Sequence, residues 1–320
     1  AFRARRATDA RGGKADMSNF LVLIVCLVAG VALRRTGRVP EAAPAAINGV
    51  ILHVSLPALT LVYLHDFHFT ASNIGPVLMP WILFAVGAGF FWAAGRWLDL
   101  ATPTVGALML VGGFGNTSFV GLPMIESLRG PEGMPLGLLI DQFGSYLALS
   151  TVGLLVAAAY SSGGRLTGMQ MLRRVATFPP FVALVLAIAL MPVTFPDEVK
   201  QALHRIGDTL APLALISVGL QLRIEALREH LRPLCLGLGY KLLVCPALVM
   251  LLFLAVDGAP DTPRHVSLIE ASMPPMIGAG IVAAQADLAP RLVSMMIGVG
   301  IPLGLVTAAA WHWLYCLISI

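Results

Sequence analysis

The chain has 320 residues, of which 58% are hydrophobic and 12% are charged, and its formal net charge is +4. Soluble domains carry about 25% charged residues, so this composition excludes a soluble globular protein and indicates an all-α protein that crosses the membrane several times. The positive charge does not indicate nucleic-acid binding, because no basic stripe and no RNA-binding motif accompanies it.

Residues 1–16 are polar and show no hydrophobic pattern, and Met17 stands directly before the first apolar run. We expect residues 1–16 to be a disordered or non-native extension and Met17 to be the natural start. A signal peptide with a basic leader is the alternative. Arg34 and Arg35 directly after the apolar run favour a retained helix end over a cleavage site.

Apolar segments of spanning length then recur along the chain, at about 20 residues each for a hydrocarbon core of roughly 30 Å. They predict ten membrane-spanning helices. We place these helices at 18–34, 46–64, 75–98, 103–128, 135–160, 176–195, 203–222, 231–256, 264–286 and 290–318.

The spacing of prolines predicts an internal repeat. Pro57 and Pro212 are 155 positions apart (212 − 57), and so are Pro135 and Pro290 (290 − 135). A repeat of this length contains five predicted spans, an odd number, so the second copy must be inverted in the bilayer. The sequence therefore predicts two inverted five-helix repeats.

The first repeat would cover 17–160 and the second 176–320, joined by a short cytoplasmic loop at 161–175. Arginines concentrate in the loops after the odd-numbered spans, and the positive-inside rule places those loops in the cytoplasm. We therefore expect a multi-pass membrane protein with both termini outside the cytoplasm.

Two predicted spans contain sequences that disfavour a continuous helix. The fourth holds GGFGNTSFVGLPMIE, and the ninth holds EASMPPMIGAG. Glycine weakens a helix, and proline removes a backbone donor. Backbone groups freed in this way must be buried in protein or line a wet cavity, and two such helices in corresponding halves indicate the binding site of a transporter. The expected helix-breaking residues are Gly115, Gly121, Pro123, Pro274 and Pro275.

Ionisable side chains inside a span cost roughly 2.5 to 3.5 kcal/mol at the helix centre, so each needs a partner or a role. Glu270 lies one turn before the proline pair of the ninth span, and Asn116, Thr117 and Ser118 lie in the other interruption. Their oxygens suit a Na⁺ site with Glu270 and Asn116 as ligands, or a carboxylate that takes up a proton. Alternatively, Glu270 and Lys241 form a buried structural ion pair.

Asp141, Lys241 and Asn48 are further candidates for substrate or ion binding. Asp141 in the fifth span could bind the ion, or it could complement the dipole at a helix N-terminus. Asn48 and His53 in the second span could line a substrate path, or they could form hydrogen bonds between helices. Apart from a coupling Na⁺ or H⁺, no cofactor is expected.

Enzyme motifs are missing from the sequence. No HExxH, GxSxG or P-loop motif occurs, and the seven histidines are scattered without ligand spacing. The sequence therefore predicts a protein that is not an enzyme.

The chain from Met17 to Ile320 resembles the auxin efflux carrier family, including its bacterial members proposed to move small organic acids. The resemblance rests on GNTSFVGLP in the fourth span, SMPPMIGAG in the ninth and APLALISVGLQL in the seventh. Asn48 followed by SLPAL, and Lys241 followed by Pro246, complete the pattern.

The resemblance implies that the fourth and ninth helices cross at their prolines, here Pro123 and either Pro274 or Pro275. It also implies a scaffold of helices one, two, six and seven, past which the other helices move as an elevator. Sodium-coupled bile acid symporters look similar, which would give Glu270 and Asn116 the parts of sodium ligands. The long central loop of the plant carriers is missing here, which favours a bacterial metabolite carrier over an auxin carrier.

The sequence thus predicts a secondary transporter for a small organic anion, such as a mono- or dicarboxylate, coupled to H⁺ or Na⁺. A sodium symporter of bile-acid-like amphipaths and a membrane sensor without transport are the alternatives. The expected partners are the substrate anion, the lipid bilayer and a second copy of the chain that pairs through the scaffold helices.

Overall fold

The computed structural model describes residues 21–65, 67, 70–161, 169, 173, 176–222, 231–255 and 261–318. In the first half, residues 21–36 are helical, followed by α2 (Ala43–Val50), η1 (Ile51–Ser55), α3 (Leu56–Leu64), η2 (Ala71–Asn73), α4 (Ile74–Trp97), α5 (Thr102–Ala107), η3 (Leu108–Gly112), η4 (Thr117–Gly121), α6 (Leu122–Arg129), η5 (Pro131–Gly133), α7 (Met134–Leu139), η6 (Ile140–Tyr146), η7 (Leu149–Gly153) and α8 (Leu154–Tyr160).

The second half contains α10 (Pro179–Ala189), α11 (Asp197–Gly207), α12 (Leu210–Gln221), α13 (Leu231–Gly239), η8 (Tyr240–Val244), α14 (Cys245–Ala255), α15 (Asp261–Ala271), α16 (Ile277–Gln285) and α17 (Pro290–Ile318). The short η2 and η5 are 3₁₀ turns, and the other η elements are π-helical turns within longer helices.

The described residues are helical apart from turns, connections and one isolated β-bridge, as the composition predicts. Five helices in this part are long and apolar enough to cross a membrane: Ala43–Leu64, Ala71–Trp97, Pro131–Tyr160, Leu231–Phe253 and Pro290–Ile318. Thr102–Gly112 and Pro179–Ala189 are shorter apolar helices. The count of ten spans and the inverted repeat remain predictions. The predicted extension at 1–16 and most of the predicted loop at 161–175 lie outside the described residues.

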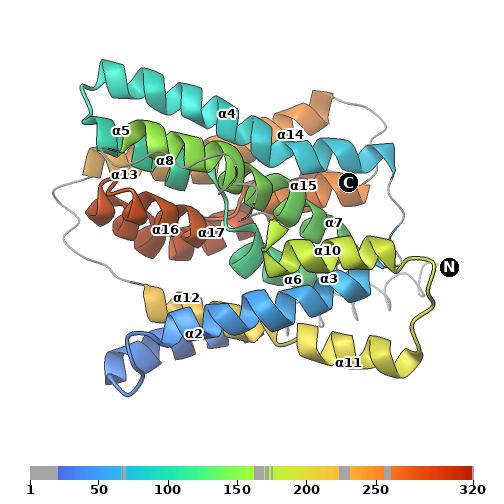
Figure 1. Cartoon of the computed structure of the whole chain (residues 1–320). Helices are drawn as coiled ribbons and strands as arrows, with labels where there is room; N and C mark the ends of the chain where they lie inside the picture. Colours follow the sequence, from blue (N-terminus) through green and yellow to red (C-terminus); the bar gives the residue numbers. More distant parts are fainter. Residues whose placement is uncertain are drawn as a thin grey trace.

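The helices form two groups, which Figure 1 shows on opposite sides of the molecule. The first group consists of residues 21–36, α2, α3, α10, α11 and α12, and the second of α4 to α8 and α13 to α17. Within the first group, residues 21–36 approach α12 closely, because a Cβ at Gly30 would lie 2.3 Å from the carbonyl oxygen of Ile216. The side chain of Arg34 then donates to the carbonyl of Leu222 at the end of α12.

Two helices of the second group are interrupted, and the interruptions meet. The chain leaves the helix at Phe114–Asn116 and again at 272–276, where Gly115 and Pro275 form an antiparallel bridge. Asn116 N donates to Pro274 O at 2.8 Å, and Met276 N donates to Phe114 O at 3.1 Å. Each interruption therefore satisfies backbone groups that the other one frees, as buried backbone requires.

The crossing lies at Gly115 rather than at Pro123, which corrects one sequence expectation. Gly121 ends the π turn η4, and Pro123 occupies the first turn of α6, so both residues lie inside a helix. A proline in the first turn of a helical segment disturbs no intrahelical bond, and the preceding π turn shifts the hydrogen-bond register around it. Pro275 does lie in the second interruption, as expected.

Glycines on α17 allow the crossing to pack closely. A Cβ at Gly300 would lie 2.7 Å from Cδ of Pro275, and a Cβ at Gly304 would lie 2.7 Å from Cβ of Pro274. Both proline rings therefore fit against a face of α17 without side chains. On the other side, the ring of Phe114 stacks on Phe84 with ring centroids 4.3 Å apart. This packing fixes the interrupted segments in the core of the second group.

Candidate functional site

Glu270, on the last turn of α15, is buried next to the crossing with 1% of its surface exposed. Its carboxyl group lies against the backbone of Gly121, where a Cβ would come within 2.3 Å of Oε2. Neither carboxyl oxygen has a hydrogen-bond partner among the described residues. Gly121 thus makes room for the carboxyl group, and the carboxyl group is left without a donor.

Lys241, on η8, is also buried, with 2% of its surface exposed. Its ammonium group donates to the carbonyl of Ala271, the last residue of α15, at 3.2 Å. A Cβ at Gly115 would lie 2.9 Å from Lys241 Nζ, so the absent side chain of Gly115 leaves space for the ammonium. In the described part of the chain Lys241 makes no ion pair with Glu270, and the expected structural bridge is therefore not formed.

Asp141, on η6, accepts two hydrogen bonds from the first interrupted helix. Thr117 Oγ1 donates to Asp141 Oδ1 at 2.6 Å, and Ser118 Oγ donates to the same oxygen at 2.5 Å. The helix around Asp141 already begins with η5 and α7, so the carboxylate lies far inside it. The alternative that Asp141 complements a helix N-terminus is therefore wrong, and the residue instead joins two helices.

Asn116 caps η4. Its amide oxygen Oδ1 accepts a hydrogen bond from the backbone N–H of Phe119 at 3.1 Å, while its amide nitrogen Nδ2 is buried without a partner. The group that this side chain leaves free is a donor, whereas a Na⁺ site needs oxygen ligands. Within the described residues, no group of three His, Cys, Asp or Glu side chains is placed to hold a metal ion.

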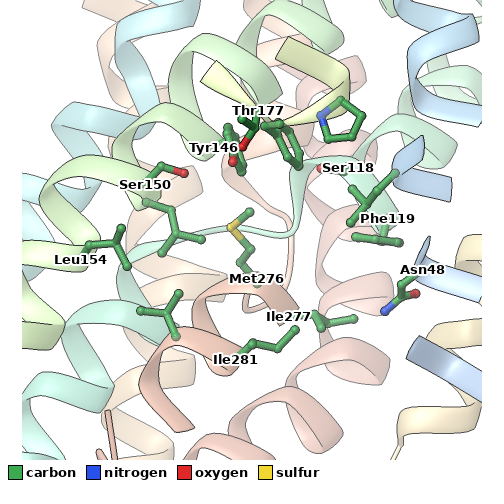
Figure 2. Close-up of a pocket in the computed structure, with 16 residues that line it drawn as sticks. Asn48, Ser118, Phe119, Tyr146, Ser150, Leu154, Thr177, Met276, Ile277 and Ile281 are labelled. Atoms are coloured by element: carbon green, nitrogen blue, oxygen red, sulfur yellow. The ribbon is translucent and has the colours of Figure 1, made fainter. Parts of the chain in front are cut away.

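A cavity of about 390 Å³ lies beside the crossing, between the two helix groups. Figure 2 shows Met276 near its middle, with Tyr146 and Thr177 above and Ile277 and Ile281 below. The lining residues are Asn48, Leu52, Ser118, Phe119, Tyr146, Leu149, Ser150, Leu154, Thr177, Phe178, Pro179, Met276, Ile277, Gly278, Ile281 and Val282.

The wall of the cavity is apolar with a few hydroxyl and amide groups, and none of its lining residues is charged. The N-terminus of α16 forms part of this wall. Ile277 and Gly278 begin α16, and the first backbone bond of that turn runs from Gly280 N to Met276 O. The N–H groups before Gly280 have no partner within the helix, and the helix dipole adds partial positive charge there.

The remaining predicted residues of the second span divide between the cavity and the outside. Asn48 lines the cavity, and its Oδ1 accepts a hydrogen bond from Ser217 Oγ at 2.6 Å, so it also joins α2 to α12. His53 is exposed, and its ring contacts the carbonyl of Gly49 on its own helix at 2.9 Å. His53 is not among the residues that line the cavity.

Several lining residues escaped the sequence analysis. Tyr146, Ser150 and Leu154 contribute one helix face, and the ring of Tyr146 stacks on Phe178 with centroids 3.5 Å apart. Their spacing of four residues is the available sequence signal, because residues at i and i+4 share a helix face. That signal shows a shared face but not what the face contacts, and Phe178 belongs to a distant segment.

An ion pair joins the outer ends of the two interrupted helices. Arg129 at the end of α6 lies 2.5 Å from a carboxylate oxygen of Asp261 at the start of α15. Burial acts to raise the pKa of Asp261, but the hydrogen bond from Tyr315 and the charge of Arg129 outweigh it and lower the pKa below its ordinary value. Asp261 therefore stays ionised at neutral pH and holds the two ends together.

Apolar helices of spanning length, two interruptions that meet in the core, and an adjoining cavity with free backbone donors define an integral membrane protein of the transporter class. The chain belongs to the membrane transport protein family, which is the auxin efflux carrier family, and the family model matches residues 17–312.

Two archaeal relatives agree with this assignment. An uncharacterized transporter of Methanothermobacter thermautotrophicus is 29% identical over 302 residues, which cover 91% of this chain and 95% of the relative. An uncharacterized transporter of Methanocaldococcus jannaschii is 22% identical over 307 residues, which cover 93% of this chain and 98% of the relative. The protein is thus a membrane transporter, a class that generally carries out no catalysis.

Proposed function

We propose that the protein is a secondary active transporter of a small organic anion, coupled to H⁺ or Na⁺. The observation that carries this proposal is the cavity next to the crossing, whose wall includes Met276, Ile277 and Gly278 at the N-terminus of α16. Such a helix start binds carboxylates through its donors and its dipole. Asn116, Thr117 and Ser118 would contribute from the other interrupted helix.

The cavity wall favours a monocarboxylate over a dicarboxylate. Because no lining residue is cationic, a second carboxylate would be buried against apolar side chains such as Leu154 and Ile281. Burying an unpaired charge is costly, whereas an apolar body gains from contact with that wall. The volume of about 390 Å³ lies within the range of small-molecule sites. We therefore expect one carboxylate on an apolar body.

The arrangement of the helices supports alternating access of the elevator type. The cavity has walls from both groups, with Asn48 and Phe178 on the first group and Ser118 and Met276 on the second. If the second group moves past the first, it carries the crossing and the α16 N-terminus with it. In this proposal the chain has ten spans in two inverted repeats, lies in a bacterial inner membrane and has both termini in the periplasm.

A panel of carboxylates tests the substrate class. Ligands that bind the native state raise the melting temperature by mass action, so the purified protein is heated with short aliphatic and aromatic monocarboxylates, with dicarboxylates and with neutral amides of the same shape. We expect saturable stabilisation by monocarboxylates and none by the amides. Stabilisation by the amides alone would contradict anion binding at the helix N-terminus.

The apolar wall also keeps a second candidate in consideration, a sodium symporter of bile-acid-like amphipaths. Steroid carboxylates with and without Na⁺ separate the two candidates in the same assay. Stabilisation by a steroid carboxylate that requires Na⁺, with no response to small monocarboxylates, would favour this second function. Ligand binding without any flux in proteoliposomes would instead favour a membrane sensor.

A further inference from the structure

Three of the carbonyl oxygens at the two interruptions accept hydrogen bonds from donors of the protein. Phe114 O accepts from Met276 N, and Pro274 O accepts from Asn116 N, at 3.1 and 2.8 Å. Ala271 O accepts from the ammonium of Lys241 at 3.2 Å. These are the backbone carbonyls that would otherwise coordinate a cation at the crossing. The ammonium of Lys241 therefore holds a position that a metal cation would need.

The charges of the buried cluster also balance without a bound cation. Asp141 accepts two short hydroxyl bonds, which suits a carboxylate ion. Lys241 supplies one positive charge, and Glu270 has no donor to either oxygen. Because an isolated buried carboxylate is costly, Glu270 is expected to be protonated, and the three groups together are then neutral.

The small free volume near Glu270 also favours a site without a bound metal ion. The void that Glu270 shares with Lys241, Thr117 and Gly115 has a volume of about 10 Å³. A void of that size holds about one water molecule, so a metal ion there would have to take all its ligands from the protein. Among the described residues, the charged groups that act on Glu270 are Asp141 from η6 and Lys241 from η8, and Lys241 in turn faces Cys245 on its own helix.

We propose that Lys241 is a resident cation that takes the place of Na⁺ at the crossing, so that the ion exchanged at this site is a proton on Glu270. The movement of this proton across the membrane rests on the proposed transport function, whereas its binding to Glu270 does not. The proton would come from water on one side of the membrane, reside on a Glu270 oxygen during the movement of the second group, and return to water on the other side.

Ser118 connects this cluster to the cavity. It lines the cavity and at the same time donates its hydroxyl hydrogen to Asp141. A substrate carboxylate at the α16 N-terminus would therefore approach a neutral cluster when Glu270 is protonated and a negatively charged one when it is not. Repulsion in the second case couples anion binding to the proton.

The test compares melting temperatures of the full-length purified protein in Na⁺ and in K⁺, at constant ionic strength, between about pH 5 and pH 8. For the wild type we expect the two salts to give the same melting temperature at every pH. We also expect that temperature to fall as the pH rises, because ionising Glu270 destabilises the buried cluster. Glu270→Gln removes the ionisation and should flatten this slope.

Lys241→Met keeps the length of the side chain but removes its charge and frees the carbonyl of Ala271. This variant should gain a stabilisation by Na⁺ that increases with pH, and the double variant Lys241→Met with Glu270→Gln should lose it again. If Lys241→Met fails to fold, the wild-type and Glu270→Gln series still decide the matter. A Na⁺-specific rise in the melting temperature of the wild type would overturn the proposal. A folded Lys241→Met protein whose melting temperature is the same in Na⁺ and K⁺ would also overturn it.

The carboxylate panel separates this inference from the proposed function. If the wild type binds monocarboxylates but is also stabilised specifically by Na⁺, the proposed function is supported and the role of Lys241 as a resident cation is contradicted. The wild type could instead show no stabilisation by any carboxylate, while its melting temperature falls with pH in a way that depends on Glu270 and not on Na⁺. That result would support the proton site and contradict the proposed substrate.

Discussion

The buried cluster around Glu270 and the cavity around Met276 both adjoin the crossing, but they differ in charge and in free space. The cluster contains three ionisable side chains, almost no free space and a donor for Asp141 but none for Glu270. The cavity is roomy, and none of its lining residues is charged. The comparison suggests that the protein separates ion handling from anion binding and links the two through the hydroxyl of Ser118.

This division predicts that substitutions in the cluster alter stability and the response to pH, whereas substitutions in the cavity alter ligand binding at nearly constant stability.

Removing the carboxylate of Asp141 should have the largest effect. Asp141→Ala leaves the hydroxyls of Thr117 and Ser118 without their acceptor, and hydrogen bonds to a charged group contribute about 1.5 to 3 kcal/mol each. We expect a loss of roughly 3 kcal/mol in the free energy of unfolding, measured in detergent by denaturant titration. Asp141→Asn keeps an acceptor and should lose clearly less. Equal losses in the two variants would show that the hydrogen bonds do not stabilise the protein.

Adding a methyl group at Gly121 should have the next largest effect. A Cβ there would lie 2.3 Å from Glu270 Oε2, so Gly121→Ala forces the carboxyl group or the helix to move, at a cost of about 1 to 3 kcal/mol. Gly75→Ala is the matched control, because nothing lies within 4 Å of its added Cβ. Thermal unfolding of the two variants measures the difference. If both behave alike, Glu270 does not occupy the position described.

A larger side chain at Gly278 should reduce binding but not folding. A Cβ there meets only Leu149 and Met276 at 3.5 Å, within the cavity wall, so valine fits the fold and fills the ligand space. We expect Gly278→Val to weaken monocarboxylate binding roughly tenfold or more, which corresponds to about 1.4 kcal/mol. Gly239→Val adds the same side chain where nothing lies within 4 Å of the Cβ, and it should bind like the wild type. Titration calorimetry measures the affinities. An affinity of Gly278→Val equal to that of the wild type would show that the ligand binds elsewhere.

The ion pair between Arg129 and Asp261 should have the smallest effect. Because the pKa of Asp261 is lowered in the folded state, its contribution is present above the ordinary pKa of the group and is lost as the pH falls through the lowered value. Asp261→Asn should cost less than about 1 kcal/mol at neutral pH, since the pair is partly exposed, and nothing in strong acid. Melting curves across that pH range, with Glu41→Gln as an exposed control, test the sign. A larger cost in acid than at neutral pH would contradict it.

The sequence predicted the parts of this site that depend on local chemistry. Glycine and proline clusters indicated both interruptions, and ionisable residues within apolar spans indicated Glu270, Asp141 and Lys241 as buried groups. What it could not predict depends on tertiary packing. The family resemblance implied a crossing at Pro123, but only the paired backbones show that Gly115 faces Pro275.

The sequence also could not predict the hydrogen-bond partners of the polar side chains. An aspartate inside a span can pair with any neighbouring helix, so its bonds to Thr117 and Ser118 could not be derived. A structural pair of Lys241 with Glu270 was one of two alternatives, and Lys241 instead binds a carbonyl of the same interrupted helix. The cavity combines residues from distant segments, such as Asn48, Thr177 and Met276, and no local pattern brings these together.

The most direct test of the account is uptake of a labelled monocarboxylate into proteoliposomes that contain the wild type or Gly278→Val, with Gly239→Val as the control. The account predicts saturable uptake by the wild type and by Gly239→Val, and little or none by a Gly278→Val protein that melts at the same temperature as its control. Wild-type uptake in a folded Gly278→Val protein would contradict the claim that the cavity beside the crossing carries the anion.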